Sequence, residues 1–295
     1  MELINVLLSV TIFLIMIGIG SSIELKDLKN IFHKPKKLIL GLVLQILLFP
    51  LFAFLISGLS NLSPEYKVGL IILAACPGGT LSNFISYIVK ADVPLSVGLT
   101  STNSLVILLT IPIYISLAFS TFMGEAVSII PPLWNILGTV GFLVIVPVLV
   151  GSYLRYLKPY KMIRSQIKIK VIASVFLGIF FIVKFFGSEN IGGIGLTKEL
   201  IFALLPWILV VNVGGLFIGW GVAKAFKFEN KVATTIGIEV GLQNTVLALL
   251  VTDVILLQPK IGHPALIYAL FSFWVTLLFG ALMLGKNNRK QKKIN

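Results

Sequence analysis

Long apolar stretches separated by short polar loops run through almost the whole chain. A helix that spans a membrane needs about 20 consecutive apolar residues. The pattern predicts nine such helices, at 3–23, 38–58, 68–89, 93–119, 131–154, 169–187, 200–223, 232–254 and 263–285. The longest loops, 155–168 and 187–199, are too short to fold alone. We therefore predict an all-α polytopic membrane protein whose residues 1–295 form one transmembrane bundle.

The composition supports a membrane protein and argues against a soluble one. Hydrophobic residues make up 57% of the chain and charged residues only 12%, and the mean hydropathy is +1.03. A soluble domain carries about a quarter charged residues. The net charge of +13 would suggest nucleic acid as a partner in a soluble protein. Here the basic residues lie in short loops beside apolar stretches, so we expect a lipid bilayer as partner and no nucleic acid.

The basic residues also predict the orientation. If the N-terminus is outside, the internal loops and the tail hold 20 of the 24 Lys and Arg residues, and the external loops hold only Lys67, Lys198 and Lys260. Lys and Arg accumulate on the cytoplasmic side of membrane proteins. We predict a plasma-membrane or inner-membrane protein with an external N-terminus, a cytoplasmic C-terminus, an external 187–199 loop and an internal 155–168 loop.

Catalytic and metal-binding motifs are missing from the sequence. Cys76 is the single cysteine, and the two histidines, His33 and His263, are in predicted loops. No G-x-S-x-G or H-E-x-x-H motif occurs, and no Cys/His spacing suits zinc. We expect a protein that is not an enzyme.

The third predicted span contains an interruption. Its centre reads Cys-Pro-Gly-Gly-Thr-Leu-Ser-Asn, at residues 76–83. Pro77 removes a helix donor, and Gly78 and Gly79 are poor helix formers. Irregular backbone at membrane depth is tolerated only where it is buried or lines a cavity. The alternative is a simple kink.

Glu239 lies in the middle of the eighth span. A carboxylate at the bilayer centre costs about 2.5–3.5 kcal/mol on insertion scales and by default suggests a functional site. The alternative is a structural Glu paired with a neighbouring helix. We identify Glu239 as the only acid well inside a span. Lys184, near the end of the sixth span, is expected to extend to the membrane interface.

Polar residues also interrupt the second and fourth spans. The fourth carries Ser96, Thr100, Asn103 and Ser104, and the first two lie on one helix face. Ser and Thr in such helices can instead bond their own preceding carbonyl groups. Gln45 in the second span either belongs to a site or joins two helices.

The third and eighth spans occupy corresponding places in two sets of four spans of opposite direction, which predicts an inverted repeat. Interrupted helices in such positions indicate the binding site of a transporter, where helix N-termini face an anion and free carbonyls bind cations. One carboxylate among amide, hydroxyl and carbonyl oxygens suits a hard cation such as sodium.

At these residues the chain resembles the bile acid:sodium symporter family in its nine-helix form. The resemblance covers about residues 5–285 and rests on Gln45 with Phe49-Pro50, the 76–83 motif, Ser96 with Thr100, and Glu-Val-Gly-Leu-Gln-Asn at 239–244. It implies that the third and eighth spans are crossed discontinuous helices. It also implies a core domain of helices at about 38–119 and 200–285, and a panel domain of helices at about 3–23 and 131–187.

The resemblance further implies two sodium sites and an anion site. Its first sodium site comprises Ser82, Asn83, Ser96, Thr100 and Glu239. Its second comprises Gln45, Glu239, Gln243 and the carbonyls of Val240 and Leu242. Its substrate contacts are Gly79, Thr80 and Asn244.

The expected function is sodium-coupled symport of a small organic anion by alternating access. The substrates that the resemblance implies are bile acids, other steroid conjugates and small carboxylates. Some relatives carry a His-Asn pair where this chain has Val275 and Thr276, so the sequence does not choose among these substrates. Two alternatives remain open: a proton-coupled or uncoupled carrier with Glu239 as the protonation site, and an intramembrane enzyme or lipid-binding sensor.

Overall fold

The computed structural model describes residues 2–22, 35–124, 138, 141–187, 193 and 197–291, and every regular element within them is a helix. In chain order these are α1 (Glu2–Ser22), α3 (Pro35–Val43), η1 (Leu44–Leu48), α4 (Phe49–Leu59), α5 (Pro64–Ala75), α6 (Thr80–Ile88), α7 (Val93–Phe122), η3 (Gly141–Ile145), α9 (Val146–Leu157), α10 (Pro159–Phe186), α11 (Lys198–Ala225), α12 (Asn230–Gly241), α13 (Thr245–Leu249), η5 (Leu250–Ile255), η6 (Pro259–Gly262) and α14 (His263–Gln291).

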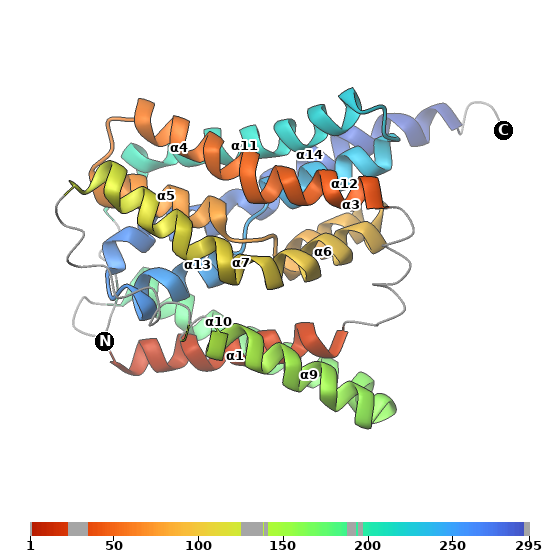
Figure 1. The fold of residues 1–295 in the computed structure, drawn as a ribbon, viewed down its shortest axis with the longest axis horizontal. Helices are drawn as coiled ribbons and strands as arrows, with labels where there is room; N and C mark the ends of the chain where they lie inside the picture. The colour runs from red at the N-terminus through yellow and green to blue at the C-terminus, as the bar shows by residue number, and fades with distance from the viewer. Residues whose placement is uncertain are drawn as a thin grey trace.

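The helices form two groups (Figure 1). Helices α1, α9 and α10 pack on one another along one side of the molecule, at the bottom of the view. The other group is built on the pairs α4–α5, α5–α7, α11–α12 and α11–α14. Helix α1 joins the two groups through its contacts with α13 and η5. This grouping resembles the predicted panel and core, although the division into domains stays a prediction.

By length and composition, four helical stretches suit a membrane span: Pro35–Leu59, Lys198–Ala225, Asn230–Ile255 and Pro259–Leu284. Two bent helix pairs raise the number to six. Shorter apolar helices at Val6–Gly18, Gly141–Leu157 and Val171–Phe186 lie within the predicted first, fifth and sixth spans or overlap them. An all-helical protein with several candidate spans agrees with the sequence, whereas the count of nine stays a prediction.

Parts of the topology prediction fall outside the described residues. These parts are the basic segment 24–34 with His33, most of the 187–199 loop, the start of the fifth span, and the end of the basic tail. The orientation of the chain in the membrane therefore stays a prediction as well.

The third predicted span is divided where Pro77 and the two glycines stand. Helix α5 ends at Ala75, α6 begins at Thr80, and the two helices are bent by 61°. The eighth span is interrupted between Gly241 and Thr245. There the backbone N–H of Asn244 donates to the Pro77 carbonyl at 3.0 Å. The two interruptions are thus in direct contact, which places two sets of free backbone groups together. That they form crossed broken spans is still a prediction.

Close packing of α11 on α12 fixes the helix that carries Glu239. A Cβ atom added to Gly219 would lie 2.8 Å from Gly237 Cα, and one added to Gly215 would lie 3.0 Å from Gly241 Cα. Small residues spaced by four allow helix backbones to approach in this way. The two glycine pairs therefore face each other across one helix contact.

A proline determines the local structure around Gln45. Pro50 has no N–H group, so it cannot bond the Ile46 carbonyl four residues earlier. The Tyr114 hydroxyl of α7 donates to that carbonyl instead. Gln45 lies just before, in the π-helical segment η1, and is 3% exposed. The widened turn thus holds a polar side chain inside the bundle.

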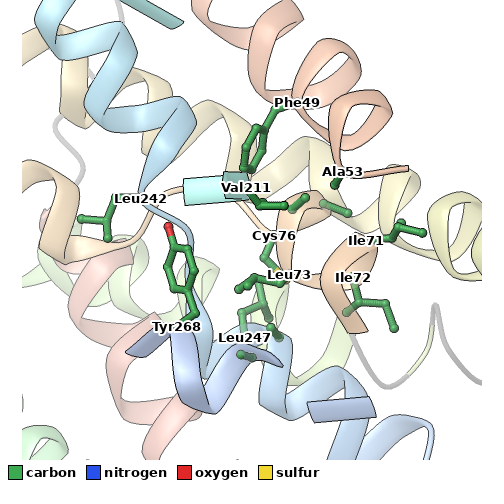
Figure 2. Packing of buried hydrophobic residues seen from close by; sticks show 14 of the residues in the cluster. Phe49, Ala53, Ile71, Ile72, Leu73, Cys76, Val211, Leu242, Leu247 and Tyr268 are labelled. Atoms are coloured by element: carbon green, nitrogen blue, oxygen red, sulfur yellow. The ribbon is translucent and has the colours of Figure 1, made fainter. Parts of the chain in front are cut away.

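An apolar core surrounds the interruption in the third span. Figure 2 shows Cys76 among Leu73, Leu247 and Val211, with Phe49 above them. Cys76 is 1% exposed and is a free thiol. Its apolar surroundings fit a packing role for the sulfur.

Candidate functional site

Glu239 occupies the last turn of α12, and its carboxylate is completely buried. The Ser96 hydroxyl is hydrogen-bonded to Oε1, and the Thr100 hydroxyl donates to Oε2 at 3.0 Å. Both hydroxyls come from one face of α7, as their four-residue spacing predicts. Within the described part of the chain no Lys or Arg forms an ion pair with this carboxylate.

The side-chain oxygens around Glu239 have more lone pairs than there are protons to fill them. Asn83 Oδ1 lies 2.8 Å from Ser96 Oγ and 3.4 Å from Thr100 Oγ1. Each hydroxyl has a single proton, yet each faces both a carboxylate oxygen and this amide oxygen. Excess oxygen around a buried negative charge is the environment that a hard cation requires. The described residues contain no group of three or more His, Cys, Asp or Glu that could hold a metal ion, so a cation here depends on one carboxylate and neutral oxygens.

The interrupted segment of the third span borders this cluster. A Cβ atom on Gly78 would lie 2.7 Å from Glu239 Oε2 and 3.1 Å from Ser82 Oγ. Ser82 is fully buried and donates to the Gly79 carbonyl at 2.7 Å. The glycine therefore leaves space in which the carboxylate and Ser82 can approach. All five residues assigned to the first predicted sodium site, Ser82, Asn83, Ser96, Thr100 and Glu239, thus lie in one cluster.

A second group of oxygens lies along the backbone after Glu239. Gln45 Nε2 donates to the Glu239 carbonyl at 2.7 Å, and Gln45 Oε1 accepts from Asn103 Nδ2 at 3.2 Å. Gln243 Nε2 donates to the Val240 carbonyl at 2.6 Å, whereas Gln243 Oε1 is buried without a partner. Leu242 lies within the interruption itself. The residues predicted for the second sodium site therefore surround the end of α12.

The predicted substrate contacts are less buried than the cation cluster. Thr80 is exposed, and Gly79 and Asn244 are half-buried. A Cβ atom on Gly79 would be 3.5 Å from Asn244 Cγ, so the two interruptions present these residues together. Asn244 Oδ1 also accepts from the Leu247 amide at 3.1 Å and caps α13.

Two buried residues near the site do not figure in the predicted ligand sets. Asn212 of α11 donates from Nδ2 to the Gly241 carbonyl at 2.8 Å and to the Tyr268 hydroxyl at 3.0 Å. The Tyr268 hydroxyl of α14 is hydrogen-bonded to the same carbonyl. Each is a polar side chain within an apolar span, the signal that singled out Gln45, and the same signal could have found them.

The prediction for Lys184 is wrong. Its ammonium group forms an ion pair with Asp253 at 2.6 Å, and the side chains are 4% and 1% exposed. Asp253 is a second buried acid, in η5 near the end of the predicted eighth span, whereas Glu239 is in the middle of that span. Lys184 therefore does not extend to an interface, because a buried ammonium group needs a counter-charge.

Comparisons with known proteins find a family model and several relatives that match this chain. The family model described as "Sodium Bile acid symporter family" matches residues 9–194. YocS of Bacillus subtilis, an uncharacterized sodium-dependent transporter, is 30% identical over 288 residues, which cover 96% of this chain and 84% of that protein. The human ileal sodium/bile acid cotransporter is 28% identical over 286 residues, which cover 95% and 78%.

Plant relatives are longer than this chain. The probable sodium/metabolite cotransporter BASS1 of Arabidopsis thaliana, a chloroplastic protein, is 30% identical over 253 residues, which cover 84% of this chain. The chain spans 58% of the length of that relative and 57% of its counterpart in Oryza sativa. The relatives named here are transporters, in keeping with the prediction of a protein that is not an enzyme. The family match over more than half of the sequence, together with the relative in Bacillus subtilis, establishes that the chain belongs to the sodium bile acid symporter family.

Proposed function

We propose that this chain is a sodium-coupled symporter of a small organic anion. One observation carries the proposal: a buried carboxylate is surrounded by side-chain oxygens that have too few protons to satisfy one another, and it has no described basic partner. A sodium ion would bind all of these oxygens and would balance the charge. The names of the relatives also describe those proteins as sodium cotransporters or sodium-dependent transporters.

Two sodium ions are proposed. The first is held by Ser82, Asn83, Ser96, Thr100 and Glu239. The second is held by Gln45, Gln243 and Glu239 with the carbonyls of Val240 and Leu242. The buried, unpartnered Oε1 of Gln243 supports the second site, because an unsatisfied buried acceptor costs about 1–3 kcal/mol and a cation would remove that cost.

The anion is proposed to bind on the accessible side of the interruptions, at Gly79, Thr80 and Asn244. The exposure of Thr80 and the half-burial of Asn244 support this placement. The substrate class is a bile acid-like molecule, another steroid conjugate or a small carboxylate. Alternating access would move the group of α1, α9 and α10, the proposed panel, relative to the remaining helices, the proposed core.

A sodium-jump experiment tests this function. Purified protein in liposomes is given an inward sodium gradient, an inward proton gradient without sodium, or neither, and uptake is measured for a panel of organic acids that includes taurocholate. Uptake that needs sodium supports the proposal. Uptake driven by the proton gradient alone would establish the proton-coupled alternative.

The same assay tests the second sodium site. The variant Gln45→Ala should lower the apparent cooperativity of uptake for sodium.

A further inference from the structure

Three consecutive carbonyls at the end of α12 are bonded to side chains instead of to the helix. In a continuous helix the carbonyls of residues 239, 240 and 241 would accept from the amides of residues 243, 244 and 245. Here Gln45 donates to the Glu239 carbonyl, and Gln243 donates through its side chain to the Val240 carbonyl. Buried backbone groups must be paired, so the interruption depends on such replacement partners.

The amides released by the interruption have replacement partners too. The backbone N–H of Gln243 donates to the Tyr268 hydroxyl at 3.1 Å, and the backbone N–H of Asn244 donates to the Pro77 carbonyl. The Tyr268 hydroxyl therefore takes the place that the Glu239 carbonyl would have in a regular helix. Figure 2 shows Tyr268 beside Leu242, the residue between its two backbone partners, and the ring is fully buried.

Tyr268 and Asn212 act on the interruption together. The Tyr268 hydroxyl accepts from the backbone N–H of Gln243 and from the side-chain Nδ2 of Asn212. It is also hydrogen-bonded to the Gly241 carbonyl. Asn212 Nδ2 reaches the Gly241 carbonyl as well, at 2.8 Å. The Tyr268 hydroxyl and the Asn212 side-chain amide thus bond the backbone groups on both sides of Leu242, the Gly241 carbonyl and the Gln243 N–H. These bonds prevent α12 from continuing through Leu242.

We propose that Tyr268 and Asn212 are positioning residues of the second sodium site. By bonding the Gln243 backbone N–H and the Gly241 carbonyl, they hold residues 241–244 out of the helix, so the Val240 and Leu242 carbonyls of the proposed site stay available to the cation. A carbonyl oxygen has two lone pairs, so the bond from Gln243 Nε2 leaves the Val240 carbonyl with one free. The inference rests on the sodium coupling proposed above and adds two residues to that site.

Tyr268→Phe is the sharpest test, because it removes one oxygen atom and keeps the buried ring. Without the hydroxyl, the Gln243 backbone N–H can return to the Glu239 carbonyl. The restored helix bond extends α12 and moves the Val240 and Leu242 carbonyls away from the positions that the site requires. We expect the half-saturating sodium concentration for thermal stabilisation in detergent to rise about tenfold, with a smaller rise for Asn212→Ala. The melting temperature in potassium should change little for Tyr268→Phe. Tyr66→Phe serves as the matched control. It removes the phenol hydroxyl of a tyrosine at the start of α5 whose ring stacks on His263.

The outcomes separate the two proposals. A parent protein that sodium stabilises no better than potassium refutes sodium coupling, and the positioning role falls with it. A parent that responds to sodium, with Tyr268→Phe and Asn212→Ala responding at the same concentrations, refutes the positioning role alone. An equal loss of melting temperature in sodium and potassium, with unchanged half-saturation, would show that the two residues are only structural and would also overturn the inference.

Discussion

The carboxylate of Glu239 is the centre of the site because of what surrounds it. A buried charge is tolerated only when other groups replace water. The hydroxyls of Ser96 and Thr100 and the side-chain amide of Gln45 replace water in part, and their protons are shared with other acceptors. The remaining demand for positive charge is what the proposed sodium ions would meet.

Glu239→Gln tests the role of that charge. The change preserves size and one oxygen, so we expect folding and membrane insertion to persist. Sodium-driven uptake should fall more than tenfold, because the amide cannot offset the desolvation of a cation. Glu199→Gln, at the exposed start of α11, is the control and should transport normally. Unchanged sodium dependence in Glu239→Gln would show that another group binds the cation.

Substrate and cation binding should separate at the interruptions. Thr80→Ala removes an exposed hydroxyl, and Asn244→Ser shortens the half-buried side chain while retaining an oxygen that can cap α13. We expect both to weaken substrate binding severalfold, whereas stabilisation by sodium without substrate stays near that of the parent. Binding assays and sodium titrations of melting temperature measure the two effects. If both variants lose sodium and substrate together, the anion site has been misplaced.

At the scale of the helix, the contact between α11 and α12 holds Glu239 in place. Glycines permit it, since a single Cβ atom at Gly219 would collide with the backbone of α12. The same side of α11 carries Asn212, which reaches the end of α12. Backbone packing and the hydrogen bonds of the interruption are therefore parts of one helix–helix contact.

Gly219→Ala and Gly221→Ala form a matched pair of substitutions within α11. A Cβ atom at Gly219 would meet both Gly237 Cα and the Ile236 carbonyl oxygen at 2.8 Å, whereas one at Gly221 would meet no atom within 4 Å. We expect Gly219→Ala to destabilise the protein by about 1–3 kcal/mol, the cost of overpacking. Gly221→Ala should be neutral or slightly stabilising, because Ala favours helix. Thermal unfolding in detergent decides, and equal melting temperatures would argue against close packing of these helices.

At the scale of the molecule, the buried ion pair links the two helix groups. Lys184 belongs to α10, and Asp253 belongs to η5. Lys184 also lies 5.7 Å from the centre of the Phe180 ring, and Asp253 accepts from the Thr252 hydroxyl at 2.9 Å. Each member of the ion pair thus also contacts a residue of its own helix group, Lys184 through Phe180 and Asp253 through Thr252.

Removing one member of this pair should be costly. Lys184→Met or Asp253→Asn leaves an uncompensated buried group, which typically costs about 3–5 kcal/mol. The double variant should recover much of this loss, and a double-mutant cycle on melting temperatures measures the coupling. Lys37→Met is the control, because Lys37 and Asp92 are 3.7 Å apart with both side chains 27% exposed, and exposed pairs contribute at most about 1 kcal/mol. Additive effects at Lys184 and Asp253 would contradict the pairing.

The predicted orientation can be tested by labelling single cysteines in a Cys76→Ala background. Lys161→Cys lies in the predicted internal loop and Lys198→Cys at the start of α11, and both parent side chains are exposed. A membrane-impermeant maleimide added to intact cells should label position 198 and leave position 161 unlabelled. Labelling of position 161 from outside would contradict the nine-span topology.

The sequence by itself determined the features that depend on local chemistry. Apolar runs require helices, Pro77 with two glycines stops one of them, and an acid in an apolar segment indicates a site. The four-residue spacing of Ser96 and Thr100 placed both on one face of α7. These signals depend on residues close together in the chain, so they can be read without knowledge of the fold.

Only the tertiary structure decided which distant groups meet. It brought Lys184 to Asp253, and it brought Tyr268 and Asn212 to the end of α12. Neither contact follows from periodicity, because a polar residue in an apolar helix shows that it needs a partner but not which helix supplies it. The packing of α10, α11 and α14 makes that choice, since a buried charge or amide is stable only where a complementary group reaches it.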